Sequence, residues 1–283
     1  MYKVSNQINQ NIITNGCLQI IYVNGYSIAD QPRDPIKAYT EHLDIIIVFD
    51  GEITLKVFNQ NRKLKSGDLF FCSRSTYSEI HTDDHAFSFA RLRFIQEKLP
   101  NDSIETRFAA SLLDSEIVKQ MIFNHCISYV SYFETSPETM DENEAKLLHK
   151  DNLEILSILN IMMEQQHQNL EIIKNKVADN ILLVDAIDLL EENLEQTPRI
   201  SAIVDELGIS HSYFVRTFKR YVGATPINFA QTLKINYSLS IISQKLESLS
   251  DISYLLGFTD QSHFNNVFRQ HLQLTPGDAA HPN

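Results

Sequence analysis

Residues 207–226 read LGISHSYFVRTFKRYVGATP, and about fifty positions later residues 256–276 read LGFTDQSHFNNVFRQHLQLTP. Both stretches contain a Leu-Gly pair, two Phe four residues apart, and a Thr-Pro pair whose Pro follows the second Phe by eight residues. They differ by one residue between the Gly and the first Phe. Such a duplication predicts two equivalent helical units that are presented to one partner.

Each copy predicts a helix, a Gly turn and a second helix. Apolar residues before each Gly recur at three- and four-residue steps, as in a short amphipathic helix. They are Ile200, Ile203, Val204 and Leu207 in the first copy and Ile252, Leu255 and Leu256 in the second. Gly208 and Gly257 permit the positive φ that ends a helix. Ser210, and then Thr259 or Asp260, suits the N-cap of the helix that follows. Two crossing helices around a Gly turn form a helix-turn-helix.

The second helix of each unit has a face opposite its two Phe. The side chains there are small, amide or cationic, the types that contact base edges and phosphates of DNA. They are Ser212, Arg216 and Lys219 in the first copy, and Ser262, Asn266 and Arg269 with the flanking Gln261 and Asn265 in the second.

A stiff connector is predicted between the two units. Pro226 suits the first position of a helix, and Phe229, Leu233, Tyr237 and Ile241 follow at four-residue steps. A helix over residues 226–244 would run roughly 28 Å, and major-groove entries on one DNA face lie about 34 Å apart. Helix pairs with Gly turns also build solenoids and bundles. Two copies in register with a stiff connector favour DNA binding.

This segment resembles the DNA-binding domain of AraC/XylS-type bacterial transcription regulators. The matching stretches are 206–214, 218–223, Thr225-Pro226 and 257–264, with a leading helix near residues 181–193. The resemblance implies DNA contacts at Ser212, Val215, Arg216, Gln261, Ser262, Asn265 and Asn266. The chain departs from the family at Asn266 and Lys234, where Arg is usual, at Val204 and Ser253, where Ala is usual, and at Ala280-His281, where Tyr-Arg is usual. Asn can still pair bidentately with adenine.

The first hundred residues predict β-structure. Runs rich in Ile, Val, Phe and Tyr cover residues 17–28, 42–49, 53–58, 68–72 and 87–94. Asp50-Gly51 predicts a hairpin, and Ser66-Gly67-Asp68 predicts a second turn. The expected architecture is an antiparallel jelly-roll sandwich or barrel. Residues 45–52 and 64–71 resemble the cupin sensor domain that commonly precedes this DNA-binding domain.

A metal site and catalysis are not expected in this domain. Cupin enzymes hold a metal with a His-x-His pair, a Glu and a later His, ligands that suit transition metals. The corresponding place reads Tyr39-Thr40-Glu41-His42, and His81 and His85 do not supply the missing pair. The sequence also has no phosphate-binding loop, nucleophile elbow or triad, so we predict no cofactor.

Six polar or amphipathic side chains are candidates for an effector site: Tyr22, Tyr26, His42, Tyr77, Arg91 and Arg93. Strand alternation places Arg91 and Arg93 on one face together with Phe87 and Phe89. An inward Arg pair would suit a carboxylate or sugar acid. An outward pair would be an ordinary solvated edge, and this is the alternative we favour.

Residues 103–177 are expected to be mostly helical. Residues 153–163 leave almost no polar face, so a helix there would be buried on every side. It would pack in a bundle with residues 115–130 or against a second subunit. Because the family typically dimerises through this region, a homodimer is expected.

The net charge of the chain is −12, which opposes binding to DNA. Residues 199–276, however, hold seven basic and five acidic side chains. Few phosphates can therefore be neutralised, and we expect weak monomeric binding. Three scattered cysteines argue against disulfides or a zinc site. The N-terminus lacks a signal-peptide pattern and no segment suits a membrane span, so a cytoplasmic protein is expected.

The sequence therefore predicts an α+β multidomain regulator. Its parts are a cupin-like sensor domain (1–102), a helical dimerisation region and linker (103–177), and a double helix-turn-helix domain (178–283). The expected partners are promoter DNA, RNA polymerase and a small-molecule effector, and family resemblance favours activation. The alternatives are a ligand- or protein-binding module without DNA readout and a metal-dependent cupin enzyme.

Overall fold

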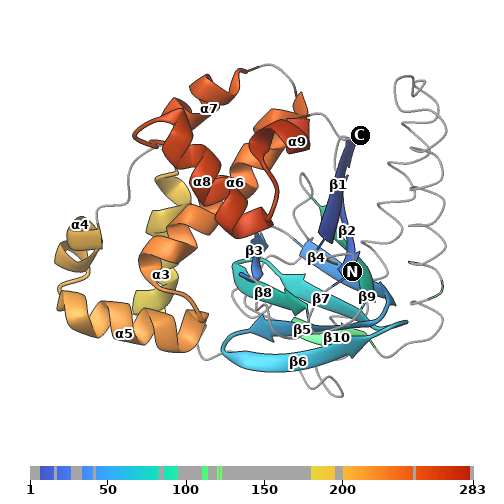
Figure 1. The fold of residues 1–283 in the computed structure, drawn as a ribbon. Helices are drawn as coiled ribbons and strands as arrows, with labels where there is room; N and C mark the ends of the chain where they lie inside the picture. Colours follow the sequence, from blue (N-terminus) through green and yellow to red (C-terminus); the bar gives the residue numbers. More distant parts are fainter. Residues whose placement is uncertain are drawn as a thin grey trace, which may run out of the picture.

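Two antiparallel β-sheets form the N-terminal part of the molecule, and the helices α3 to α9 form the C-terminal part (Figure 1). The computed structural model describes residues 7–15, 18–26, 34–40, 43–82, 86–94, 110–113, 120, 122, 180–194, 200–244 and 247–280. The apolar segment 153–163, and the bundle and dimer contacts expected of it, lie outside these residues. No described helix is both long and apolar enough to cross a membrane.

The first sheet has six strands in the order β1-β2-β9-β4-β7-β10. They are β1 (Gln7–Asn15), β2 (Leu18–Tyr26), β9 (Ala86–Phe94), β4 (Leu43–Asp50), β7 (Leu69–Ser73) and β10 (Ala110–Leu113). The second sheet has the order β3-β8-β5-β6. Its strands are β3 (Ile36–Thr40), β8 (Thr76–Thr82), β5 (Glu52–Val57) and β6 (Gln60–Lys65). Apolar side chains of both sheets, including Ile46, Phe70, Ile53 and Leu55, belong to one buried core.

The five predicted strands are present as β2, β4, β5, β7 and β9, with ends shifted by one or two residues where they are described. The hairpin predicted at Asp50-Gly51 is wrong, because β4 pairs with β7 and β9 whereas β5 pairs with β6 and β8. Gly51 instead carries the chain from one sheet to the other with φ +74°. A Cβ at this position would lie 2.1 Å from the Ala86 carbonyl oxygen, so only glycine fits.

Five strands were not predicted: β1, β3, β6, β8 and β10. The strand β6 is an edge strand with mostly exposed polar side chains, and it lacks the alternation that marks a half-buried strand. The strand β10 lies inside the segment expected to be mostly helical and pairs with β7.

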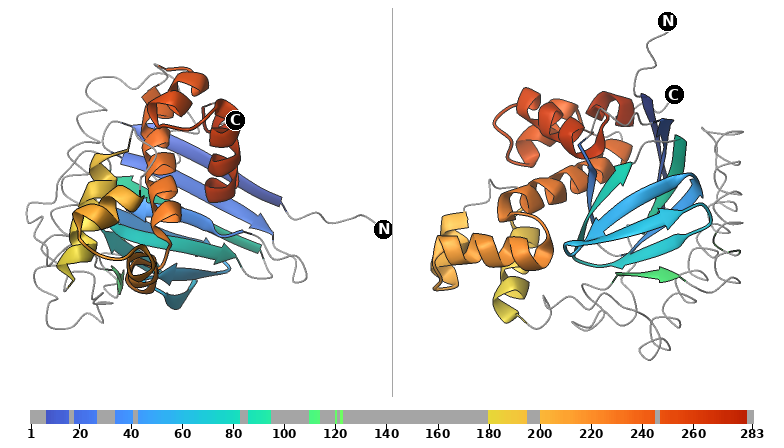
Figure 2. Two further views of the ribbon diagram at one scale, coloured as in Figure 1. Left: turned by 90° about the vertical axis from the view of Figure 1, so that its left-hand side faces the viewer. Right: turned by 60° about the horizontal axis from the view of Figure 1, so that its bottom comes forward.

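The C-terminal helices match the predicted arrangement. They are α3 (Ile181–Glu192), α4 (Ile200–Glu206), α5 (His211–Val222), α6 (Pro226–Gln244), α7 (Leu249–Leu255), α8 (Gln261–Leu272) and α9 (Pro276–Ala280). The pairs α4–α5 and α7–α8 are the two helix-turn-helix units, and α6 connects them. The units lie toward opposite ends of α6, and the helical part packs on one side of the sheets (Figure 2).

The connector α6 is buried over more of its surface than its apolar residues at four-residue steps predicted. Phe229 and Leu233 are buried, but Tyr237 is 39% exposed. Buried polar residues also lie on more than one side of α6, among them Thr232, Lys234, Asn236 and Ser238. The side that carries Asn236 faces the sensor domain, where its Nδ2 donates to the Tyr39 carbonyl, and both α6 and α8 lie against β3 (Figure 1).

Candidate DNA-binding surface

The two turns have the same backbone geometry. Gly208 and Gly257 have φ +65° and +67°. Each donates its N–H to a carbonyl three residues earlier, that of Asp205 at 3.2 Å and that of Tyr254 at 2.9 Å. The following residue of each copy donates to the carbonyl five residues earlier. The two units are therefore structural repeats and not only a repeat in sequence.

A side-chain cap begins each second helix. Ser210 Oγ accepts the N–H of Tyr213 at 3.3 Å, and Asp260 Oδ1 accepts the N–H of His263 at 2.8 Å. Of the two predicted caps in the second copy, Asp260 is the one used. A cap of this kind contributes about 1 kcal/mol and fixes where the exposed helix begins.

Two Phe anchor each second helix in the core, all four of them almost fully buried. The rings of Phe214 and Phe218 are 5.4 Å apart, and those of Phe264 and Phe268 are 5.6 Å apart. Because these rings fix the rotation of α5 and α8, the opposite face of each helix is turned to solvent.

Seven of the nine predicted DNA-contacting residues are exposed: Ser212, Arg216, Lys219, Gln261, Ser262, Asn266 and Arg269. Val215 and Asn265 are half-buried. Val215 packs against the core, and Asn265 Oδ1 is buried with no hydrogen-bond partner among the described residues. The seven exposed residues are the small, amide and cationic side chains that were predicted on this face.

One equivalent pair of exposed side chains was not predicted from the sequence. Tyr213 and His263 each precede the first Phe of their copy, and both are exposed at the start of the second helix. His263 Nδ1 lies 3.1 Å from Thr259 Oγ1. Their shared position in the repeat was the available signal.

The positive charge of this surface is uneven. The helix α5 exposes Arg216, Lys219 and Arg220, whereas Arg269 is the exposed Lys or Arg of α8. The first unit is therefore better suited to phosphate contacts. Amide groups dominate the second, which suits base edges more than phosphates.

Comparison with known proteins agrees with this surface. A family model described as a helix-turn-helix domain matches residues 203–281. The HTH-type transcriptional activator RhaS of Shigella dysenteriae serotype 1 (strain Sd197) is 24% identical over 268 residues, which cover 89% of this chain and 91% of the relative. RhaS of Escherichia coli (strain 55989 / EAEC) is also 24% identical, over 270 residues. Residues 203–281 thus match a helix-turn-helix domain, and over most of its length the chain is similar to transcription regulators.

The similarity to solved structures extends over both parts of the chain. The crystal structure of unsaturated fatty acid-bound wild-type ToxT from Vibrio cholerae strain SCE256 has a TM-score of 0.56 and 14% identity, covering 95% of this chain and 96% of that chain. An apo ToxT variant from the same strain has the same score and identity. The β-sheets followed by helix-turn-helix units are therefore a shared fold.

Lys234, which stands where the AraC family usually has Arg, has a structural role here. Its Nζ donates to the Leu256 carbonyl at 2.5 Å and lies 5.5 Å from the centre of the Phe258 ring. Burial lowers the pKa of Lys234 to about 8. The side chain thereby ties α6 to the turn of the second unit.

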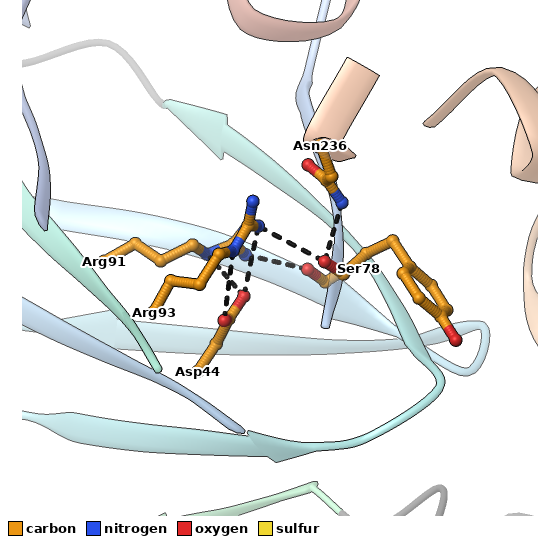
Figure 3. A network of polar contacts seen from close by, with 6 residues as sticks. Asp44, Ser78, Arg91, Arg93 and Asn236 are labelled. Atoms are coloured by element: carbon orange, nitrogen blue, oxygen red, sulfur yellow. Dashed lines mark hydrogen bonds and ion pairs between the residues drawn. The ribbon is translucent and has the colours of Figure 1, made fainter. Parts of the chain in front are cut away.

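The Arg pair of the sensor domain is buried, so the favoured interpretation of a solvated edge is wrong. Arg91 and Arg93 are each 3% exposed and flank Asp44, which is fully buried (Figure 3). Arg93 Nε donates to Asp44 Oδ1 at 3.3 Å, and Arg91 Nε lies 3.5 Å from Oδ2. Burial lowers the pKa of Arg91, and the charge of Asp44 opposes this effect.

The same cluster reaches the connector helix. Arg93 donates to the Tyr39 carbonyl at 3.2 Å, and Asn236 Nδ2 of α6 donates to that carbonyl at 2.6 Å (Figure 3). Arg91 donates to Ser78 Oγ at 2.8 Å. The Tyr39 carbonyl thus accepts hydrogen bonds both from the buried charged cluster and from α6.

Of the other four candidate effector residues, the structure describes the side chains of two. Tyr77 is buried and donates to Glu79 at 2.8 Å, and burial raises its pKa. Tyr22 is half-buried with its ring 6.0 Å from that of Phe49. The side chains of Tyr26 and His42 lie outside the described residues. Within the described part of the chain, no three His, Cys, Asp or Glu residues are placed to hold a metal ion.

His271 at the end of α8 predicts a pH effect on stability. Burial lowers its pKa from 6.5 to about 4, although its bond to the Val267 carbonyl at 2.8 Å favours the charged form. The native side chain stays neutral while the unfolded one binds a proton below pH 6.5, so stability should fall between pH 6.5 and 4. Urea unfolding at pH 8 and pH 5 should show a larger loss for the native chain than for H271Q. Equal losses would contradict this assignment.

Proposed function

We propose that this protein activates transcription by inserting α5 and α8 into neighbouring major grooves of promoter DNA. The observation that carries the proposal is the repeated unit, which caps, anchors and exposes both helices in the same way. Arg216 and Asn266 occupy equivalent exposed positions, two residues after the first Phe of each copy. That the relatives are named transcriptional activators supports activation over repression.

The two helices are assigned different tasks. Arg216 can pair bidentately with guanine, and Lys219 and Arg220 can neutralise phosphates. Asn266 and Gln261 can pair bidentately with adenine. The remaining predicted contacts, Ser212, Ser262 and Arg269, would fix the register of each helix on the backbone.

An effector with a carboxylate is the second element of the proposal. Two buried guanidinium groups face one carboxylate, Asp44, which leaves a positive charge uncompensated among the described residues. Arg91 Nε and Arg93 Nη1 are buried and have no hydrogen-bond partner among the described residues. ToxT, which shares the fold, has been solved with an unsaturated fatty acid, a carboxylate ligand.

The sensor part is proposed to be a cupin-like jelly roll. The strand orders β2-β9-β4-β7, within the six-stranded sheet, and β3-β8-β5-β6 support this topology, because from β2 to β9 the chain passes repeatedly between the two sheets. We further infer a homodimer through residues 103–177, contact with RNA polymerase at the promoter, and action in the cytoplasm.

Selection of DNA from a random-sequence pool with the full chain tests the proposal. The enriched duplex should contain two blocks of preferred bases about 10 base pairs apart. Placed upstream of a weak promoter, this selected duplex should raise reporter expression when the protein is present. No enrichment would reject DNA readout, and lower expression would indicate a repressor.

A further inference from the structure

The strands β1, β3, β6 and β10 form the edges of the two sheets, and three of these edges are protected. An unprotected edge presents a row of unpaired backbone groups, which proteins guard with charged side chains, short strands or a covering element. The strand β6 carries Arg62, Lys63 and Lys65 within six residues. The strand β3 is covered by α6 and α8, and β10 has four residues. Each of these three edges is therefore a poor template for a further strand.

The hairpin that contains β6 also has a partner within the chain. Asn59 lies between β5 and β6, and its Nδ2 donates to the carbonyls of Lys219 and Arg220 on α5, both at 2.9 Å. These carbonyls belong to the last turn of a helix, where acceptors lack intrahelical donors. Contact with α5 thus occupies the tip of this hairpin.

The edge strand β1 has none of these protections among the described residues. It extends over nine residues, Gln7–Asn15, and pairs with β2 at each of them without a change of register. Its sequence QINQNIITN contains no charged residue, Pro or Gly, although 21% of the residues of the chain are charged. Among the described elements, β2 alone has extensive contacts with β1 (Figure 2). The outer edge of β1 is therefore long and uninterrupted.

The backbone groups of this edge favour another strand as the partner. In an antiparallel pair, every second residue directs its N–H and C=O away from the neighbouring strand. On the outer side of β1, no described strand pairs with these groups. An added antiparallel strand satisfies the whole row at once, and the number of hydrogen bonds gained increases with the length of the edge.

Charge and composition favour a second copy of this chain over a different protein. The net charge is −12, so two copies repel each other over most of their surfaces. The uncharged strand β1 adds no repulsion at the place where the copies would meet. Five of its nine side chains are amides and three are Ile, so identical strands offer each other matching polar and apolar groups. Two identical strands can also pair about a twofold axis, the commonest symmetry of homo-oligomers.

We propose that β1 pairs antiparallel with β1 of a second copy, so that the six-stranded sheet continues from one copy into the other. Full overlap of the nine residues places Asn11 opposite Asn11, Gln10 opposite Ile12 and Gln7 opposite Asn15. This contact goes beyond the proposed function and is separate from the dimer contact inferred for residues 103–177. A chain that forms both contacts joins dimers to one another.

Charged side chains at Asn11 test the pairing. N11K and N11D each place like charges opposite one another, because the Cβ atoms of opposed residues lie about 5 Å apart. Each variant alone should raise the dissociation constant of this contact at least about tenfold, and an equal mixture of the two should restore it to within about threefold. Sedimentation velocity over a range of concentrations measures the mass and the dissociation constant.

The matched control is Q60K, which adds a lysine to an exposed position of the edge strand β6. Its mass should equal that of the native chain, whereas the mass of N11K or N11D alone should be half as large. Circular dichroism at a concentration where the native chain is dissociated checks that each variant is folded. Recovery of the native mass on mixing excludes a structural defect, because two damaged chains do not repair each other.

Three results would overturn the pairing. They are a native mass equal to that of both Asn11 variants, a mixture whose mass stays as low as that of either variant, and an equal loss of mass in Q60K. DNA is absent from the experiment, so its result is independent of the proposed function.

Discussion

Replacing Arg216 with alanine is expected to weaken binding of the selected duplex about 10- to 100-fold, because a bidentate arginine–guanine contact contributes about 1–3 kcal/mol. Arg216 is exposed on α5, opposite the buried Phe214 and Phe218, so its loss leaves the packing of the unit intact. The dissociation constant is measured by fluorescence anisotropy at one fixed salt concentration, since salt alone changes the affinity for DNA.

Two further variants distinguish the loss of base recognition from the loss of a positive charge. K65A removes one exposed positive charge from β6 of the sensor domain, and its affinity should change by less than about threefold. R216K keeps the charge but loses the planar fork, so it should lose discrimination between selected and scrambled DNA. Unaltered affinity in R216A would favour the alternative of a protein-binding module.

Replacing Asp44 with alanine should destabilise the chain by about 3–5 kcal/mol, the typical cost of removing one partner from a buried charge cluster. Asp44 is fully buried and is the carboxylate that faces both Arg91 and Arg93. Without Asp44, the two guanidinium groups stay buried in a low-dielectric environment. None of the described residues next to them then carries a negative charge. Urea unfolding followed by circular dichroism measures the loss.

The matched control is E52A, which breaks an ion pair on the surface of the same sheets. Glu52 lies 2.6 Å from Lys63 Nζ, but both side chains are well exposed, so the loss should be below about 1 kcal/mol. If a carboxylate effector binds at the cluster, it should stabilise D44A more than the native chain. A loss below about 1 kcal/mol in D44A would show that the charges are screened by other groups.

The helix-turn-helix units were predictable because their signals are local. The glycine turns, the caps at Ser210 and Asp260, and the four Phe all act within a few residues of one another, and each is confirmed. The five apolar strands were predictable for a similar reason, since hydrophobic runs bounded by turn residues identify strands without knowledge of their partners.

Features that depend on distant residues were not predictable. Asp50-Gly51 has the composition of a hairpin, but whether the flanking strands pair depends on the whole sheet topology. The burial of Arg91 and Arg93 depends on Asp44, which lies on another strand, and alternation gives only the face that they share. The contact of Asn59 with α5 joins residues 160 positions apart, and no local pattern marks it.

The spacing of the two half-sites is the most direct test of the account. The units are joined by α6, a single helix of 19 residues, so the distance between the grooves that they reach is nearly fixed. Insertion of five base pairs between the two blocks of the selected duplex turns them to opposite faces, and insertion of ten restores the face but doubles the distance. Both insertions should weaken binding at least about tenfold, because only one unit can then contact its block of preferred bases. Unchanged affinity with both inserted duplexes would contradict the account.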